Sequence, residues 1–156
     1  MILRQICFVS NDLENALKSF SFITGSDVCF RDEGVSYFGL KNGLLEVDGN
    51  FLEVVSPFKP NTTAERFLTR MNGDAGYMLI FECEDADIYR KKAFDLNIRD
   101  IWNADLDNGV KATHYHPKDI GGLIISVDSM NNVNWKNKDS YWQWGGKTWS
   151  ENKNNK

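Results

Sequence analysis

The sequence predicts an α+β fold made of two halves, each with the order strand, helix and then several antiparallel strands. In the first half, a strand and a helix over residues 3–25 precede a series of short strand-like runs separated by turn residues. A helical linker follows at residues 62–71, and from residue 76 the same order of elements begins again. The halves share this order without recognisable sequence identity, so the repeat is one of structural pattern.

The first half opens with an alternating apolar stretch, LRQICFVS (3–10), which predicts a strand. A helix is expected over residues 11–25, because Asn11 or Asp12 can cap it, apolar residues recur at helical spacing from Leu13, and Gly25 ends it. Further strands are predicted at residues 27–32, 35–40, 43–48 and 50–57, where turn signals such as Asn42-Gly43 and Asp48-Gly49 separate the runs.

The second half repeats this order with a strand at residues 76–85 and a helix at residues 85–97. Four apolar positions, Ala86, Tyr89, Ala93 and Leu96, fall on one face of this helix, and Asn97 can take the left-handed conformation at its exit. Three more strands are predicted at residues 98–106, 109–116 and 122–128.

Composition excludes several classes of function. The formal charge of -4 and the absence of a basic stripe argue against binding to nucleic acid or to anionic lipid. No apolar run approaches the ~20 residues of a membrane helix, and the N-terminus does not resemble a secretory signal. The odd number of cysteines, Cys7, Cys29 and Cys83, favours buried, reduced thiols in a cytoplasmic protein.

The C-terminal segment differs from the rest of the chain. Residues 131–150 are polar yet carry most of the tryptophans, and we expect them to pack on the domain or on a partner subunit, because exposed Trp is costly. The two tryptophans Trp142 and Trp144 can present one aromatic face that roofs a pocket, or they can clip the outside of a sheet or form a dimer seam. Residues 151–156 are expected to be disordered.

Two stretches suggest a family. The β–α–β–β–β unit used twice, together with FLEVVSP (51–57) and HPKDIGGLIISVD (116–128), resembles the vicinal oxygen chelate superfamily, which includes glyoxalases, bleomycin-resistance proteins, extradiol dioxygenases and epimerases. The second stretch is similar to the last corner of methylmalonyl-CoA epimerases. The resemblance implies one domain over residues 1–130, with modules at about 1–60 and 75–130 and a linker at 61–74, in which paired curved sheets surround a cup-shaped cavity.

In such proteins four inward-facing residues, one from each of four strands, bind a divalent metal. The matching positions in this chain are Gln5, Glu53, Met78 (or Tyr77 if the count slips by one) and Ser126. Glu53 is the one strong ligand among them, since Met sulfur is soft and a Ser hydroxyl is weak. We therefore expect no metal or other cofactor, and regard a divalent ion held by Gln5 and Glu53 as the weaker alternative.

The two histidines have different expected roles. The resemblance places His116 in the corner, where its imidazole ties down the backbone. His114 lies two residues before His116 and therefore shares its strand face. It is either a pocket-lining acid/base or hydrogen-bond donor with a pKa near neutrality, or a surface residue.

Glu53 is the leading catalytic candidate. If Phe51, Glu53 and Val55 face inward, burial among apolar neighbours raises the carboxyl pKa and suits the group to carry a proton. The alternative is that Glu53 pairs with Gln5 and only closes the cup. Glu82, on the same face as Met78 and Ile80, is expected at the solvent-exposed rim.

Two functions follow from these patterns. The first is proton-transfer chemistry, of isomerase, epimerase or lyase type, on a small carboxylate, acyl thioester or ketone. In it Glu53 acts as base, with His114 as a second catalytic candidate and with Gln5, Met78, Ser126, Trp142 and Trp144 contacting the substrate. The second is metal-free binding or sequestration of a small molecule, as in bleomycin-resistance proteins; a degenerate scaffold is a third reading. A homodimer is expected from the resemblance.

Overall fold

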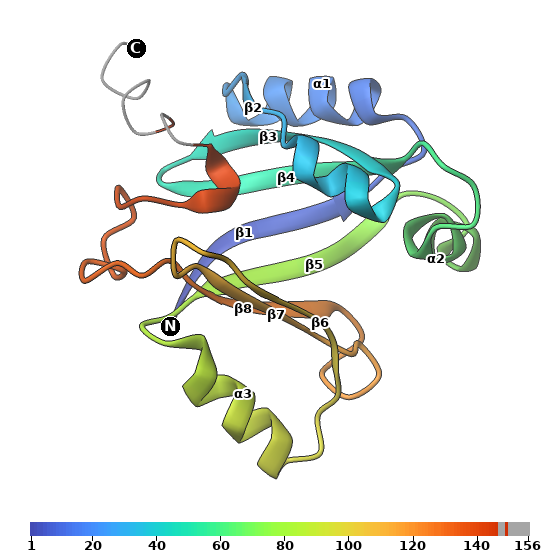
Figure 1. Ribbon diagram of the computed structural model, residues 1–156. Helices are drawn as coiled ribbons and strands as arrows, with labels where there is room; N and C mark the ends of the chain where they lie inside the picture. Colours follow the sequence, from blue (N-terminus) through green and yellow to red (C-terminus); the bar gives the residue numbers. More distant parts are fainter. Residues whose placement is uncertain (147–148, 150–156) are drawn as a thin grey trace.

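The computed structural model describes residues 1–146 and residue 149. Eight strands form a single curved sheet in the order β2-β3-β4-β1-β5-β8-β7-β6 (Figure 1). The strands are β1 (Ile2–Val9), β2 (Val28–Phe30), β3 (Leu40–Val47), β4 (Asn50–Pro57), β5 (Ala75–Glu82), β6 (Asp100–Asp105), β7 (Lys111–Tyr115) and β8 (Ile124–Ser129). The helices are α1 (Leu13–Thr24), α2 (Thr63–Met71), α3 (Ala86–Asp95) and the 3-10 turns η1 (Glu33–Phe38) and η2 (Gln143–Gly145).

Pairing within the sheet confirms the two halves. β1 runs parallel to β4, and β5 runs parallel to β8 in the same way. The remaining neighbours in each half are antiparallel. The halves meet where β1 pairs antiparallel with β5, so the two predicted modules form one continuous sheet. The sequence-predicted α+β class and the repeated order of elements are therefore confirmed.

The helix caps follow the sequence closely. The side chain of Asp12 accepts a hydrogen bond from the backbone N–H of Asn15 at the start of α1, and Gly25 ends that helix at φ 71°. Thr62 caps α2 in the same manner, and Asn97 takes the predicted left-handed conformation after α3 at φ 55°. Each cap satisfies backbone groups that a helix end leaves unpaired.

Two local predictions were wrong. Residues 35–40 were predicted as a strand, but η1 occupies most of this stretch, because the Asp32 carboxylate caps the Gly34 N–H and Gly39 ends the turn at φ 73°. Leu96 does not belong to the packed face of α3: it is the C-cap residue, and 70% of its surface is exposed. In both places side-chain capping and a left-handed residue override the apolar pattern.

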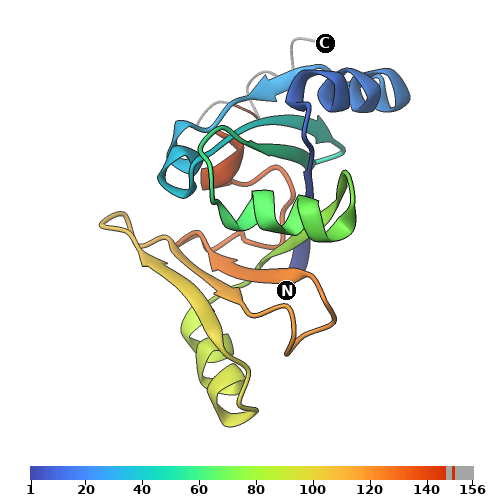
Figure 2. The same ribbon diagram turned by 90° about the vertical axis from the view of Figure 1, so that its right-hand side faces the viewer.

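The helices α1 and α3 cover the outer, convex side of the sheet at opposite ends of the molecule (Figures 1 and 2). Leu13 and Leu17 of α1 pack on Leu45 and Val54. Ala93 of α3 belongs to a second cluster. That cluster contains Cys83, Ala86, Ala93, Tyr115 and Val127. The largest core lies on the inner side and includes Cys7, Phe51, Val55, Phe67, Met78, Ile124 and Trp142. Inner and outer residues alternate along each strand, as the pleat requires.

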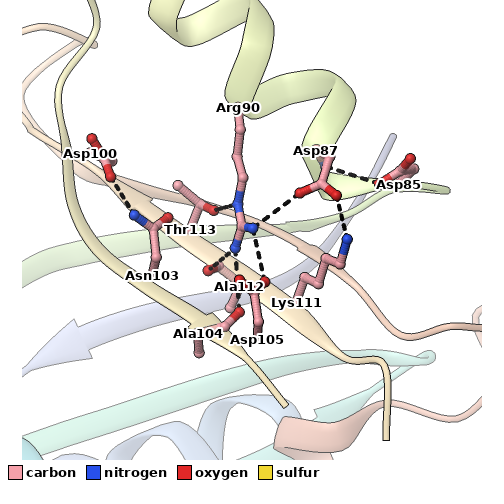
Figure 3. Close-up of polar contacts among 10 residues, drawn as sticks. All are labelled: Asp85, Asp87, Arg90, Asp100, Asn103, Ala104, Asp105, Lys111, Ala112 and Thr113. Carbon is pink, nitrogen blue, oxygen red and sulfur yellow. Dashed lines mark hydrogen bonds and ion pairs between the residues drawn. The ribbon is translucent and has the colours of Figure 1, made fainter. Parts of the chain in front are cut away.

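Arg90 joins helix α3 to the far edge of the sheet, where Lys111 of β7 also contacts Asp87 of the helix (Figure 3). Arg90 donates to the Thr113 hydroxyl at 2.7 Å, to Asp105 at 2.8 Å and to the carbonyl oxygens of Ala104 and Ala112 at 3.3 and 3.2 Å. It also donates to Asp87 on its own helix at 3.0 Å. The guanidinium thereby joins α3, β6 and β7 through charge-assisted hydrogen bonds.

Replacing Arg90 with Met is expected to lower the free energy of unfolding by about 2 kcal/mol, because several partly buried acceptors lose a charged donor. Urea denaturation followed by circular dichroism measures this loss. Lys91→Met on the same helix is the control, since Lys91 makes an exposed ion pair with Asp95 and its loss is expected to change stability far less. Equal losses in the two variants would contradict the proposed role of Arg90.

The cysteines and the helices bear on the remaining predictions. Cys7 and Cys83 are buried as expected, whereas Cys29 is exposed, because β2 lies at the edge of the sheet. None of the helices within residues 1–146 and 149 combines the length and the hydropathy of a transmembrane helix. The predicted disordered tail, residues 151–156, lies outside the described residues.

Candidate functional site

All four residues matched from the resemblance lie on the inner face of the sheet. Of these four, Gln5 and Glu53 are joined by a hydrogen bond. Gln5 donates from Nε2 to Glu53 Oε2 at 2.7 Å. Met78 pairs in register with Cys7 and Ile124, while Ser126 pairs with Ile80. Ile80 of β5 is also the partner of Gln5. Gln5 on β1 and Ser126 on β8 therefore flank the same residue of β5, one on each neighbouring strand.

Glu53 sits at the centre of a buried hydrogen-bond chain. Its side chain lies between Phe51 and Val55 on the inner face, as alternation predicted, and it is 5% exposed. Asn42 donates from Nδ2 to Glu53 Oε1 at 2.6 Å, so each carboxylate oxygen accepts an amide N–H. Asn42 is itself held, because its Oδ1 accepts the backbone N–H of Asp32 at 2.8 Å.

The electrostatics of Glu53 combine opposing effects. Burial raises the pKa of its carboxyl group, and hydrogen bonds from Asn42, Cys7 and Gln5 offset part of that rise. Burial and the neighbouring carboxylate also raise the pKa of the Cys7 thiol well above its usual value, so this thiol stays protonated. A desolvated acid held by neutral donors is able both to lose and to accept a proton.

A second buried acid was missed by the sequence reasoning. Asp128 is 1% exposed and lies two residues after Ser126 on the same strand face. It accepts hydrogen bonds from Ser126 Oγ at 2.6 Å and from Trp144 Nε1 at 2.6 Å. Burial raises the pKa of Asp128 to about 7. Alternation from Ser126 was the available signal, because the next inward position of β8 is Asp128.

A buried ion pair lies at the N-terminal end of β1. Arg4 donates from Nη1 to Glu82 Oε2 at 2.9 Å, and both side chains are fully buried. The prediction that Glu82 lies at the exposed rim was therefore wrong. Burial raises the pKa of Glu82 to about 7 although Arg4 acts to lower it. A register irregularity between Leu3 and Gln5 allows the consecutive residues Arg4 and Gln5 to contact the same indole ring.

The indole that Arg4 and Gln5 contact is that of Trp142, which belongs to residues 131–146. We call this segment the strap. The strap follows β8 along the open side of the sheet to η2, which lies against β3 and β4 (Figure 1). Trp142 is fully buried in the inner core, and its Nε1 donates to Gln5 Oε1 at 3.1 Å. Trp144 reaches Asp128, as described above. The two tryptophans therefore enter the cup and bind its polar groups, and they do not lie on the outside of the sheet.

His114 lies on the inner face, paired in register with Ser126 and Trp102. Its ring is 4.5 Å from the ring of Trp102 and 6.3 Å from that of Phe38. The expectation of a pKa near neutrality was wrong, because burial lowers the pKa of His114 to about 4. The imidazole is therefore neutral at pH 7 and packs against aromatic rings, and it is not poised between its two charge states.

Replacing His114 with Phe is expected to remove part of the acid sensitivity of the protein. A folded pKa below the unfolded value of 6.5 gives stability that is present above pH 6.5 and is lost as the pH falls toward 4. The loss in the wild type is about 2 kcal/mol after allowance for partial exposure. Urea denaturation at several pH values measures it, and an unchanged decline in the variant would contradict the assignment.

His116 belongs to the corner, as the resemblance implied. Its Nδ1 accepts the backbone N–H of Lys118 at 3.1 Å, and its own backbone N–H donates to the Arg99 carbonyl oxygen. Asp119 completes the corner by accepting two hydrogen bonds from the Arg99 guanidinium, at 2.8 and 2.7 Å. These contacts give His116 a structural role in the turn before β8.

The inner-face residues do not suit the divalent metal of the resembling proteins. Both oxygens of Glu53 and the amide oxygen of Gln5 already accept N–H groups, which a cation would have to replace. Met78 offers a soft sulfur, and Ser126 donates to Asp128. Within residues 1–146 and 149 no three His, Cys, Asp or Glu side chains gather in a way that would hold an ion.

A hollow of about 360 Å³ lies elsewhere, between α3 and the outer side of the sheet. Its lining is apolar apart from Lys92 and the two tyrosines Tyr89 and Tyr115, and no acidic residue belongs to it. The candidate chemistry lies on the opposite side of the sheet, so we place the functional site on the inner face and not in this hollow.

Comparison with solved structures identifies the fold. A methylmalonyl-CoA epimerase variant from Streptomyces coelicolor, in complex with 2-nitronate-propionyl-CoA, aligns with a TM-score of 0.73 and 17% identity over 85% of this chain and 99% of that chain. Methylmalonyl-CoA epimerase from Mycobacterium tuberculosis aligns with a TM-score of 0.70 and 19% identity over 81% and 86% of the two chains. A hypothetical protein from Bacillus halodurans aligns with a TM-score of 0.70 and 12% identity over 81% and 92%.

No protein-family model and no curated protein sequence matches the chain. At the identities found, the structural neighbours establish the fold: it is the one shared by methylmalonyl-CoA epimerases, which are members of the vicinal oxygen chelate superfamily. The resemblance stated from the sequence is confirmed at this level.

Proposed function

We propose that this chain, which has the vicinal oxygen chelate fold, moves a proton on a carbon atom next to a carbonyl group, with Glu53 and Asp128 as the two proton carriers. The observation that supports this proposal best is the pair of buried carboxyl groups on the inner face, one from each module, whose pKa values burial raises. Structural neighbours named as epimerases of an acyl thioester are consistent with this type of chemistry.

The proposed reaction needs one carboxylate and one carboxylic acid. Glu53 takes a proton from the substrate carbon, the electron pair of the C–H bond forms a carbon–carbon double bond, and the carbonyl oxygen becomes an enolate. Asp128, with a pKa of about 7, returns a proton to the same carbon from the other side, and the double bond collapses back to the carbonyl. Return from the opposite face inverts the carbon, and return by the first acid exchanges its hydrogen.

The substrate class is a small carboxylate or its acyl thioester. Its probe is methylmalonyl-CoA in D2O, with loss of the C–H signal followed by proton NMR. We expect exchange well above the buffer rate with the wild-type protein or with Gly145→Val, a variant that displaces the strap because a Cβ at Gly145 would lie 2.6 Å from the Phe51 ring. Exchange at the buffer rate with both proteins would contradict the proposed substrate class.

Ligand binding without chemistry is the second candidate, and a specific contact favours it. The inner face holds the Trp142 indole, whose N–H is accepted by Gln5 and whose ring lies 5.0 Å from the Arg4 guanidinium. A cup built this way is suited to a flat aromatic compound that carries an N–H donor. Sequestration predicts a bound compound that is recovered unchanged, and appearance of a product by mass spectrometry would contradict it as the sole function.

A further inference from the structure

The strap closes the site proposed above. Gln5, Glu53 and Asp128 are each at most 5% exposed, so no substrate reaches them in this arrangement. Trp142 donates a hydrogen bond to Gln5, and Trp144 donates one to Asp128, so the strap occupies acceptor atoms that a substrate would use. Gly145 lies so close to Phe51 that there is no room for a side chain, which seals the cup further.

The strap has few contacts that hold it to the rest of the domain. Much of it is exposed chain, including Val133 at 97% exposure, and it makes only short turns in place of strand pairing. Its ion pair between Lys138 and Asp48 is exposed and 3.4 Å long. Segments with few buried contacts open at the lowest free-energy cost in a folded protein. The tryptophans that enter the cup are therefore the main attachment of an otherwise loosely held segment.

The strap also covers a buried cation. Beyond its pair with Glu82, Arg4 donates hydrogen bonds to the strap carbonyl oxygens of Asn137 and Ser140, both at 3.4 Å, and the carboxylate of the strap residue Asp139 also stabilises its charge. Within the described part of the chain, its Nε has no hydrogen-bond partner. The guanidinium lies 5.0 Å from the Trp142 ring and 5.7 Å from the Trp149 ring. A carboxylate satisfies a guanidinium better than two distant carbonyl groups do, because it offers two charged acceptors in matching geometry.

We infer that the strap occupies the place of an anionic ligand, and that such a ligand displaces it by binding Arg4. The inference rests on the proposed function for the identity of the site, and it adds both the ligand charge and the way in which access is controlled. Trp142 and the strap carbonyls then stand in for the ligand while the site is closed.

Thiol labelling tests the opening without any reference to catalysis. Cys7 lies on the inner face beside Glu53, and Cys83 lies under α3 on the other side of the sheet. In a Cys29→Ser background, Trp142→Ala is expected to speed alkylation of Cys7 by iodoacetamide about 100-fold, because loss of a buried indole weakens the strap. Peptide mass spectrometry reads the two cysteines separately. Gly145→Val is the second opening variant, and it leaves the tryptophans intact.

Labelling of Cys83 decides between opening and unfolding. We expect its rate to stay at the wild-type value in both variants. Unchanged Cys7 labelling in both variants would overturn the strap as a barrier, and so would equal acceleration of Cys7 and Cys83, which indicates general loosening.

The anion is tested with malonate as the probe. Release of Trp142 into water is expected to shift tryptophan emission to longer wavelength on addition of malonate, whereas malonamide, its neutral analogue, has no effect. The double variant Arg4→Met with Glu82→Gln removes the cation without leaving its partner charged and buried, and it is expected to abolish the shift. No shift in the wild type, or the same shift in the double variant, would overturn Arg4 as the anchor.

The two proposals fail separately. Expected labelling and emission results together with absent proton exchange would refute the chemistry and retain the strap. The reverse outcome is proton exchange by the wild-type protein together with equal rates of Cys7 labelling in the wild type and the opened variants. It would retain the chemistry and refute the strap as a barrier.

Discussion

Glu53→Gln is expected to reduce proton exchange on methylmalonyl-CoA by a factor of at least about 100, since a positioned general base contributes about 10²–10⁴-fold to such reactions. The amide that replaces the carboxylate is a very poor base, and it also offers only one acceptor oxygen where two are used. Gln5 and Asn42 both donate to the carboxylate, so one of them would face an N–H₂ group in the variant. The variant is therefore expected to lose catalysis strongly and some stability as well.

The measurement is the exchange rate by proton NMR in whichever background shows exchange, wild type or Gly145→Val. Circular dichroism and thermal denaturation establish how much of each sample is folded. Glu84→Gln is the matched control, because Glu84 is an exposed glutamate on the loop before α3. An exchange rate in Glu53→Gln within about threefold of the parent, corrected for the folded fraction, would rule out Glu53 as the base.

Asp128→Asn is expected to become more stable relative to the wild type as the pH rises from 4 to 8, by as much as about 4 kcal/mol. The folded pKa of Asp128 is raised from 3.8 to about 7. The stabilisation that comes from this acid is thus complete below its unfolded pKa and is lost as the pH rises through about 7. Asparagine carries no charge at any pH, and it can still accept from Trp144 and donate to Ser126.

Urea denaturation of both proteins at several pH values gives the difference in the free energy of unfolding. Comparing the variant with the wild type cancels the opposing contribution of His114 and the parallel ones of Glu53 and Glu82 to a first approximation. Asp107→Asn, a change at an exposed turn residue, is the control and is expected to show no such trend. A difference that stays constant with pH would mean that the pKa of Asp128 is not raised in the folded protein, contrary to the proposed role.

Much of the fold was predictable because its signals are local. Asp12, Thr62, Gly25 and Asn97 fix helix ends through hydrogen bonds and backbone angles that depend on only a few neighbouring residues. The pleat of a strand fixes which residues share a face, so Glu53 was expected on the same face as Phe51 and Val55, and the resemblance indicated that this face points inward. The repeated order of elements then gave the architecture.

The candidate site was predictable only in part. The resemblance placed Gln5, Glu53, Met78 and Ser126 on the inner face, but the position matched for the last acid is Ser126, and the acid lies two residues later, at Asp128. The error over Glu82 has a different origin. A carboxylate near a strand end normally stays in water, and it is buried here because Arg4 neutralises it.

The sequence by itself determined the elements, their caps and the faces of the strands, because each of these depends on residues that are close along the chain. Only the tertiary structure decided what those faces meet. Arg4 and Glu82 are 78 positions apart, and Trp142 lies 137 positions from Gln5. Such contacts arise from strand order and from the path of the strap, and no local pattern of charge or hydropathy encodes them. Burial then sets the pKa values, because desolvation depends on everything that surrounds a group and not on its neighbours in sequence.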